Sequence, residues 1–253
     1  MKMKNTTSSV IHLAEVDSTN IYLRRLIDEG KAQDGCIVWA DYQNAGRGQM
    51  GTHWESASGV NLTFSVACFP KDLPISQQFV ISEIGALAVR DALMHYASDI
   101  TVKWPNDVYW RDCKISGTLI EVGVTDTQLN YTISGIGINI NQKSFAGDAP
   151  NPVSLYQIIH KETDCQEVLL RFIDALDGYR AQLERGEIEA LHQAYFASLY
   201  RREGFHPYQD QTGRFEAAID SVEPDGHLHL RLYDGTLRRY AFKEVSYVIE
   251  KKS

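Results

Sequence analysis

ITVKWPNDVYWRDCKISGTLIEVGVTDTQLNYTISGIGINI, residues 100–140, is the stretch that decides the fold. It contains four runs with strand character, at about 100–103, 107–110, 114–124 and 129–140. Short turns at Arg111-Asp112 and at Asp126 separate the second run from the third and the third from the fourth. We therefore expect neighbouring strands of this stretch to pair in antiparallel fashion.

The segments on both sides of this stretch add helices and further strands. Before it, the pattern predicts strands at about 10–14, 36–40 and 60–68, a helix from Asp17-Ser18-Thr19-Asn20 to Gly30, and a longer helix over 75–97. After it, we expect helices at about 166–184 and 187–201. From Phe205 the short strands and Asp-Gly turns indicate a small β-barrel. The predicted fold is α+β, with a mixed, mostly antiparallel sheet in residues 1–203 and a β-barrel domain in residues 204–253.

The composition is that of an ordinary globular chain, with no sign of a nucleic-acid or membrane partner. The 253 residues carry a formal net charge of −8, whereas nucleic-acid-binding proteins usually show a basic excess. The first ten residues lack the apolar core of a signal peptide, and no stretch reaches the ~18 apolar residues of a membrane span. Four cysteines stand far apart without metal-ligand spacing, so we expect reduced thiols, no protein-bound metal and a cytoplasmic location.

A glycine-rich loop, GRGQMGTHW at residues 46–54, is the first candidate site. It contains GxGxxG, but a dinucleotide-binding fingerprint requires a helix directly after the glycines, and here an alternating strand follows. A P-loop is excluded as well, because no Gly-Lys-Ser/Thr follows. Two interpretations remain open: an anion site of backbone N–H groups with Arg47 as a bidentate donor, or a flexible turn with an incidental arginine.

Three further motifs within residues 100–140 carry chemistry. In KWPND, residues 103–107, a lysine, an amide and a carboxylate surround a proline that makes the turn rigid. Lys114 enters an apolar strand, where a charge is costly unless it meets an anion or reaches solvent. Gly135 and Gly137 share one face of the last strand and leave room there for a ligand or for close packing. Each motif alone is also compatible with a structural role.

Together, and in this order, the motifs resemble those of the biotin protein ligases. That family carries a GRGxxGxxW loop, a KWPND turn, a lysine-x-x-glycine strand and a GxGIN strand, and this chain matches all four as well as a DSTN segment at 17–20. The resemblance covers roughly residues 10–250 and implies a biotin/lipoate ligase fold of the class II synthetase-like type with an SH3-like C-terminal domain. The chain departs from some members at Gln49, Met50 and Thr52, where those members carry arginines.

The resemblance also implies roles for individual residues. Biotin would be bound by Ser18, Thr19, Asn20, Gln43, Gly46, Arg47, Lys114 and Gly117. ATP and the adenylate would be bound by Arg47, Gly48, Trp54, Lys103, Asn106, Lys114 and Asn139. The residues implied in catalysis are Arg47, Lys103, Asp107 and Lys114. Among them, Asp107 is our candidate for the group that acts on an acceptor amine, and a turn-capping role is its alternative.

The activity implied is that of a biotin–[acetyl-CoA-carboxylase] ligase, which adenylates biotin with Mg-ATP and transfers it to a lysine of a biotin carboxyl carrier protein. Mg²⁺ would be held largely by phosphate oxygens and water. One alternative is a lipoate or octanoyl ligase or transferase, for which Cys113 is the only candidate nucleophile. Another is a biotin-sensing regulator, which would need a helix-turn-helix segment, and only nine residues precede the first predicted strand. Exposed strand edges make a homodimer conceivable.

Overall fold

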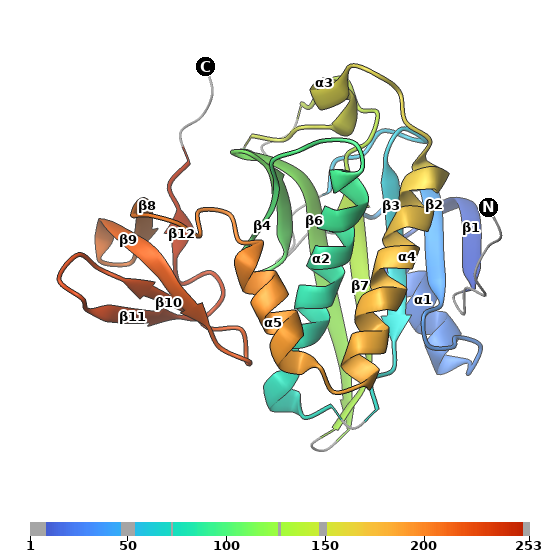
Figure 1. The fold of residues 1–253 in the computed structure, drawn as a ribbon. Helices are drawn as coiled ribbons and strands as arrows, with labels where there is room; N and C mark the ends of the chain where they lie inside the picture. The colour runs from blue at the N-terminus through green and yellow to red at the C-terminus, as the bar shows by residue number, and fades with distance from the viewer. Residues whose placement is uncertain (1–8, 47–53, 72, 126–127, 147–150, 250–253) are drawn as a thin grey trace.

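The structure, a computed structural model, describes residues 9–46, 54–71, 73–125, 128–146 and 151–249. Its elements, in chain order (Figure 1), are β1 (Val10–Val16), α1 (Thr19–Asp28), β2 (Ile37–Gln43), β3 (Leu62–Cys68), η2 (Ile75–Gln77), α2 (Phe79–Met94), β4 (Ile100–Lys103), β5 (Asp107–Trp110), β6 (Cys113–Thr125), β7 (Gln128–Ile138), α3 (Leu155–Ile159), α4 (Cys165–Glu184), α5 (Ile188–Ala197), β8 (His206–Asp210), β9 (Gly213–Val222), β10 (Leu228–Arg231), β11 (Leu237–Tyr240) and β12 (Ser246–Tyr247).

A seven-stranded sheet in the order β1-β2-β3-β7-β6-β5-β4 forms the centre of the molecule (Figure 1). β1 and β2 are parallel, and every other neighbouring pair is antiparallel. The four strands predicted between residues 100 and 140 are β4 to β7, and they pair with one another in chain order. The predicted α+β class with a mixed, mostly antiparallel sheet is therefore confirmed.

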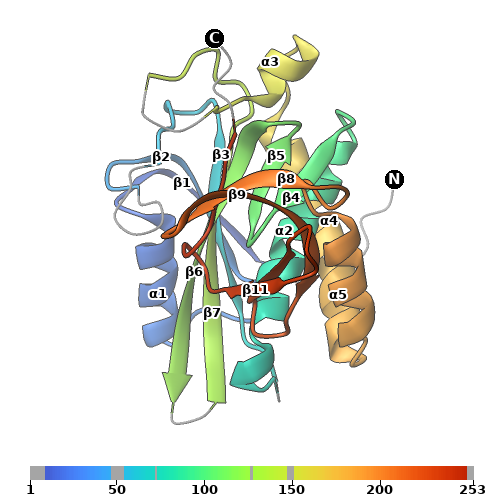
Figure 2. The ribbon, with the colours of Figure 1, turned by 90° about the vertical axis from the view of Figure 1, so that its left-hand side faces the viewer.

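The two faces of the central sheet differ because of the alternation along β7. Ile136 and Ile138, each at most 2% exposed, belong to the core that α2 and α4 cover. Gly135 and Gly137 lie on the opposite face, the one against which α1 packs (Figure 2). Successive side chains of a strand point to opposite faces, so the two glycines thin only the α1 side of the sheet. Three of the predicted site residues lie in the space left there, namely Asn20, Trp54 and Lys114.

The C-terminal residues form a second sheet, in the order β11-β10-β9-β8-β12. We predicted a small β-barrel here; the β-domain is present, but it is not a closed barrel, because β11 and β12 are the two edges of an open sheet. The reason is tertiary packing: Leu228 and Leu230 of this sheet share one core with Trp104 and Tyr195 of the preceding segments. Side chains from outside the sheet cover its apolar face, so the sheet does not need to close on itself to bury that face.

Two local features differ from the sequence prediction. The long helix α2 begins at Phe79, because Ile75–Gln77 forms a separate 3₁₀ turn after Pro74. The short helix α3 was not predicted. The predicted domain boundary at residues 203–204 falls between α5 and β8 and stays a prediction. Within the part of the chain that the structure describes, no helix is long and apolar enough to cross a membrane.

Candidate active site

Five buried or half-buried polar residues meet at the N-terminus of α1; we call Ser18, Thr19, Asn20, Gln43 and Ser65 the polar cluster. Ser18 is the N-cap of α1, yet its side chain makes no capping hydrogen bond. Thr19 and Asn20 are 2% and 5% exposed, although both belong to the first turn of a helix. A serine at an N-cap usually bonds the helix backbone, so the unused hydroxyl of Ser18 is available to another partner.

Hydrogen bonds within the polar cluster fix the orientation of its amides. Gln43 Oε1 accepts from both the backbone N–H and the hydroxyl of Thr19, at 2.8 and 3.0 Å. The Nε2 group of Gln43 is thereby directed toward Gly46, where an added Cβ would lie 3.4 Å from it. The Ser65 hydroxyl lies 2.7 Å from Thr19 Oγ1 and 2.5 Å from Asn20 Oδ1, and its single proton serves one of them at a time.

Asn20 packs against the backbone of β7 and keeps one donor unused. A Cβ at position 135 would lie only 2.2 Å from Asn20 Oδ1, so Gly135 is required for this contact. The Nδ2 group of Asn20 is buried and has no hydrogen-bond partner among the described residues. Buried donors are nearly always paired in folded proteins, so Asn20 points to an acceptor supplied by a ligand.

The indole of Trp54 fills the next part of the same sheet face. We call Gly117, Gly135 and Gly137 the glycine face. A Cβ at Gly137 would lie 2.3 Å from Trp54 Cε2, and one at Gly117 would lie 3.1 Å from Trp54 Cζ3. The indole Nε1 is buried and has no partner among the described residues. The two glycines therefore form a cradle for Trp54, and a second unused donor lies on this face.

Lys114 and Asp107 form an ion pair beside this cradle. Lys114 Nζ donates to Asp107 Oδ2 at 2.8 Å, and the two side chains are 24% and 21% exposed. Lys114 also lies over Gly117, where an added Cβ would be 3.0 Å from its Cε. The ammonium therefore meets a carboxylate of the KWPND turn at the edge of the glycine face, which joins two motifs that the sequence placed apart.

The KWPND turn is held in place by contacts on three sides. The indole of Trp104 donates to the carbonyl of Gly226 at 2.9 Å, and the Tyr195 hydroxyl donates to the carbonyl of Pro105 at 2.8 Å. Asn106, which is 6% exposed, donates to the Ser82 hydroxyl of α2 at 3.0 Å. These contacts fix the backbone between β4 and β5, and with it the positions of Lys103 and Asp107.

Asn139 directly follows β7 and is buried, 3% exposed. Its Nδ2 donates to the carbonyl of Val153 at 3.1 Å, while its Oδ1 is buried without a partner among the described residues. Lys103 stands at the end of β4, and its ammonium lies against two tyrosine rings. The sequence-predicted residues Arg47 and Gly48 lie outside the described residues. The other predicted site residues lie in α1 or at its N-cap, in β2 or in the segment between β2 and β3, and in β4 to β7 and the segments that border them.

Sequence reasoning missed Ser65, which completes the polar cluster. Ser65 is 0% exposed and lies in β3, where five of its neighbours in LTFSVAC are buried as well. A serine inside a fully buried strand needs a hydrogen-bond partner, and that was the available signal.

Cys113, the candidate nucleophile of the transferase alternative, is 8% exposed and packs in the hydrophobic core.

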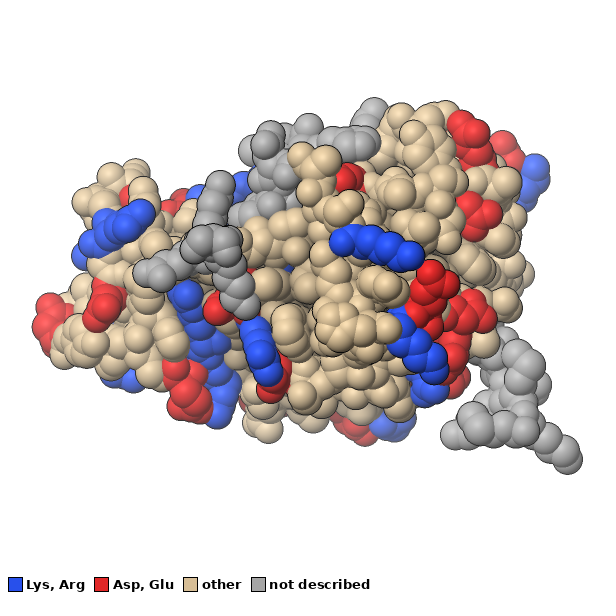
Figure 3. All heavy atoms as spheres, turned by 90° about the horizontal axis from the view of Figure 1, so that it is seen from above, with Lys and Arg blue, Asp and Glu red and all other residues tan. Residues whose placement is uncertain are grey.

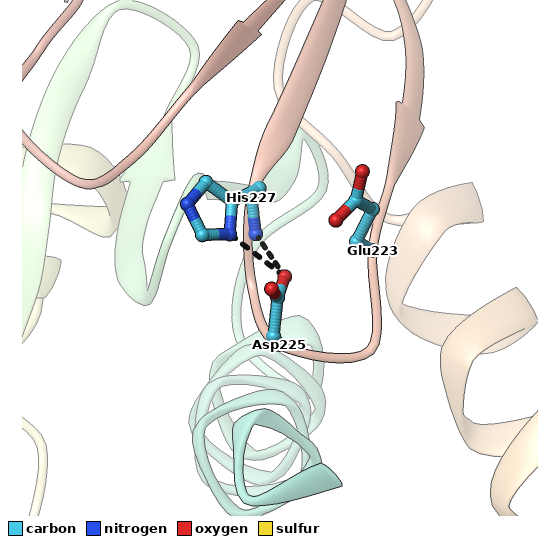
Figure 4. Close-up of side chains that lie close together, drawn as sticks. All are labelled: Glu223, Asp225 and His227. Atoms are coloured by element: carbon cyan, nitrogen blue, oxygen red, sulfur yellow. Dashed lines mark hydrogen bonds and ion pairs between the residues drawn. The ribbon is translucent and has the colours of Figure 1, made fainter. Parts of the chain in front are cut away.

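A separate charged cluster lies in the turn between β9 and β10 (Figure 4). Potential ligand atoms of Glu223, Asp225 and His227 lie within 4.8 Å of one another. Arg239 forms ion pairs with both carboxylates, and His229 Nε2 lies 2.5 Å from Glu223. Hydrogen bonding to the Arg239 guanidinium holds the pKa of Glu223 at about 2. Arg239 of the same sheet thus offsets part of the negative charge of this cluster. On the face drawn in Figure 3, basic and acidic side chains are likewise interspersed.

The chain is similar in sequence and fold to several known proteins. The bifunctional ligase/repressor BirA of Escherichia coli K12 is 37% identical over 132 residues, which are 52% of this chain and 40% of that protein. The biotin–[acetyl-CoA-carboxylase] ligase of Paracoccus denitrificans is 29% identical over 228 residues, 87% of this chain and 92% of that protein. A solved structure of the biotin protein ligase from Aquifex aeolicus in complex with biotin and ATP has a TM-score of 0.78 at 26% identity, with 95% of this chain and 99% of that chain covered.

This chain spans less than half the length of the E. coli relative, 40% of it. The sequence model of the Biotin/lipoate A/B protein ligase family matches residues 13–139. That range takes in half of the chain, including the polar cluster, the glycine face and the Lys114–Asp107 pair. The chain therefore belongs to the Biotin/lipoate A/B protein ligase family.

Proposed function

We propose that the chain is an ATP-dependent biotin protein ligase, which forms biotinyl-5′-AMP and transfers biotin to a lysine of a biotin carboxyl carrier protein. The names of two relatives support this: the Paracoccus protein is a biotin–[acetyl-CoA-carboxylase] ligase, and the Aquifex ligase was solved with biotin and ATP. The observation that carries the proposal is the buried polar cluster, which lies on the same glycine-lined sheet face as Lys114.

The polar cluster suits the ureido head of biotin. A ureido group offers two N–H donors and one carbonyl acceptor, so its site needs both acceptors and a donor. The unused Asn20 Nδ2 is the donor for the carbonyl, and the hydroxyl of Ser18 is an acceptor for an N–H. A plain acyl chain would leave these buried groups unpaired, which costs about 1–3 kcal/mol for each group. The cluster therefore favours biotin over octanoate.

Lys114 suits the first chemical step. In that step an oxygen of the biotin carboxylate attacks the α-phosphorus of ATP, the bond from that phosphorus to the bridging oxygen breaks, and pyrophosphate leaves. Negative charge gathers at the α-phosphate, and a preorganised ammonium such as that of Lys114 stabilises it. We assign Arg47 to the same charge, although it lies outside the described residues. Mg²⁺ would be bound by phosphate oxygens and water.

Asp107 suits the second step, in which the acceptor lysine attacks the carbonyl carbon of the adenylate and AMP leaves. The attacking amine must lose a proton, and we assign its acceptance to Asp107, whose Oδ2 lies 2.8 Å from the Nζ of Lys114, the residue proposed for the first step. Lys114 turns toward the phosphate when the nucleotide binds, which leaves Asp107 able to accept the proton. One ion pair thus serves both half-reactions. We also propose a cytoplasmic location, which the four cysteines in thiol form support.

The test is biotin-dependent exchange of radiolabelled pyrophosphate into ATP, followed by addition of a biotin carboxyl carrier domain. We expect exchange with biotin, and one biotin on the carrier lysine by mass spectrometry. A carrier with that lysine replaced by arginine is the matched control and should stay unmodified. Lipoate and octanoate are run in parallel. Exchange that is faster with either of them than with biotin would assign the chain to the other branch of the family.

A further inference from the structure

The ammonium of Lys103 lies between the rings of two tyrosines that belong to different sheets. Its Nζ is 5.5 Å from the ring centre of Tyr109 on β5 and 4.8 Å from that of Tyr247 on β12. Tyr200 stacks on Tyr109 at 5.5 Å and lies 5.9 Å from Tyr247, so the rings of Tyr109, Tyr200 and Tyr247 form one group next to Lys103. Through Tyr247, the second sheet thus contacts Lys103, a residue predicted to bind ATP.

The charges around Lys103 leave room for an anion. Lys103 and Asp107 face each other across β4 and β5, but Asp107 is already bonded to Lys114, and none of the ion pairs among the described residues includes Lys103. One carboxylate between two ammonium groups leaves one positive charge in excess. Burial lowers the pKa of Lys103, Asp107 opposes this, and Lys114 adds to it. A partly buried cation of this kind is stabilised by an anion that comes from outside.

The ring of Tyr247, rather than its hydroxyl, makes the contact. The hydroxyl is buried and has no hydrogen-bond partner among the described residues. The ring contacts Lys103 on one side and lies 4.9 Å from the ring of Tyr208 on another. The face of an aromatic ring attracts a cation, and a rigid ring also restricts the rotamers of a long lysine side chain.

We propose that Tyr247 is a positioning residue for the adenylation step, because its ring holds the Lys103 ammonium in the orientation that receives the phosphates of ATP. The inference rests on the proposed function and extends it, since it makes the second sheet part of the nucleotide site. The polar cluster is built from α1, β2 and β3 alone. Tyr247 should therefore affect ATP and leave biotin binding unchanged.

The test compares Tyr247→Leu and Tyr247→Met, which remove the ring, with Tyr247→Phe, which keeps it and removes only the unpaired hydroxyl. Tyr240→Leu is the matched control, because Tyr240 is a buried tyrosine of the same sheet that stacks on Phe215 and not on Lys103. ATP and biotin binding to the full chain are measured by calorimetry, together with the KM for ATP in pyrophosphate exchange and the rate of transfer from presynthesised biotinyl-adenylate. Melting curves establish that each variant is folded.

We expect Tyr247→Leu and Tyr247→Met to weaken ATP binding and raise its KM roughly 3- to 30-fold, the range of a partly to fully desolvated cation–π contact. Tyr247→Phe should recover most of the loss, while biotin binding and the transfer rate stay within error in all variants. Equal ATP affinities in the leucine and phenylalanine variants would overturn the inference, and so would an equal loss in Tyr240→Leu. Failure of the proposed function would give a different result, because the wild-type chain would then show no biotin-dependent exchange of pyrophosphate. The ATP titrations would still compare the Tyr247 variants with one another.

Discussion

A Cβ atom at position 135 would lie 2.2 Å from Oδ1 of Asn20, so the missing side chain of Gly135 determines where this asparagine sits. Asn20 Oδ1 is in turn 2.5 Å from the Ser65 hydroxyl, which also contacts Thr19. A residue of β7 with no side chain thus sets the position of a polar network built on α1 and β3. The hydrogen-bond network therefore depends on Gly135, although Gly135 contributes no side chain to it.

Gly135→Ala should therefore weaken biotin binding without unfolding the chain. The methyl group displaces Asn20 and breaks its bond to Ser65, and the ureido carbonyl loses its donor. Losing the pairing of a buried polar group costs about 1–3 kcal/mol, or roughly 5- to 150-fold in the dissociation constant for biotin, measured by calorimetry. The control is Gly178→Ala, because Gly178 is exposed in α4 and an added Cβ meets nothing within 4 Å. This control should be more stable by about 0.5–1 kcal/mol and bind biotin normally.

A buried acid–base pair between α2 and α5 predicts that the free energy of unfolding falls as the pH rises. Glu83 Oε2 is 2.6 Å from His192 Nδ1, and Glu83 is 1% exposed. Burial raises the pKa of Glu83 above 4.5, and Glu83 raises the pKa of His192 above 6.5. Both groups bind protons more tightly in the folded state, so their contribution is full at low pH. The contribution of the pair to the free energy of unfolding decreases once the pH exceeds 4.5, the ordinary pKa of a glutamate. It is lost as the pH passes through the raised pKa of His192.

Urea denaturation at about pH 5 and about pH 8 measures this slope. In Glu83→Gln the carboxyl group no longer titrates and His192 loses its anionic partner, so the difference in unfolding free energy between the two pH values should shrink. A variant whose slope equals that of the wild-type chain would show that the pair does not contribute to the pH dependence.

Removing residues after 203 should destabilise the rest of the chain, because the two sheets share one core. Trp104 and Tyr195 are 3% and 0% exposed, and both pack against residues of the second sheet. Without that sheet Trp104 also loses its hydrogen bond to Gly226. We expect a lower melting temperature, binding of a hydrophobic dye, and a red shift of tryptophan fluorescence that disappears when Trp104→Phe is added. A truncated chain that melts like the full chain would support residues 203–204 as the boundary of an independent domain.

The hairpins of residues 100–140 could be predicted from the sequence because their signals are local. Alternation and two short turns place β4 to β7 close to the observed bounds. Helix α3 could have been found as well, since Ser154 and Gln157 form a capping box, which has a sequence signature. The open second sheet could not be predicted, because its closure depends on whether distant side chains such as Trp104 cover its apolar face.

The candidate site divides in the same way. Residues within recognisable motifs, such as Asn20, Lys114 and Gly137, were predicted, because each motif is continuous in the chain. Tyr247 was not predicted, because it follows Lys103 by 144 residues in the sequence. The strand that contains it, β12, also has only two residues. A contact between side chains so far apart follows from the fold and leaves no pattern in the sequence.

Lys114 and Asp107 should fail in different half-reactions although they form one ion pair. Lys114→Ala removes the ammonium that meets the α-phosphate, so pyrophosphate exchange should fall about 10²–10³-fold, as for a typical preorganised donor. Lys114→Arg should not restore it fully, because a planar guanidinium does not replace a compact ammonium.

Asp107→Asn keeps an oxygen that accepts from Lys114 Nζ, 2.8 Å away in the wild-type chain, but it cannot accept a proton from the acceptor amine. This variant should therefore exchange pyrophosphate nearly normally and transfer biotin slowly from presynthesised biotinyl-adenylate. If Asp107→Asn lost exchange as completely as Lys114→Ala, Asp107 would belong to the nucleotide site, and its assignment to the amine would be wrong.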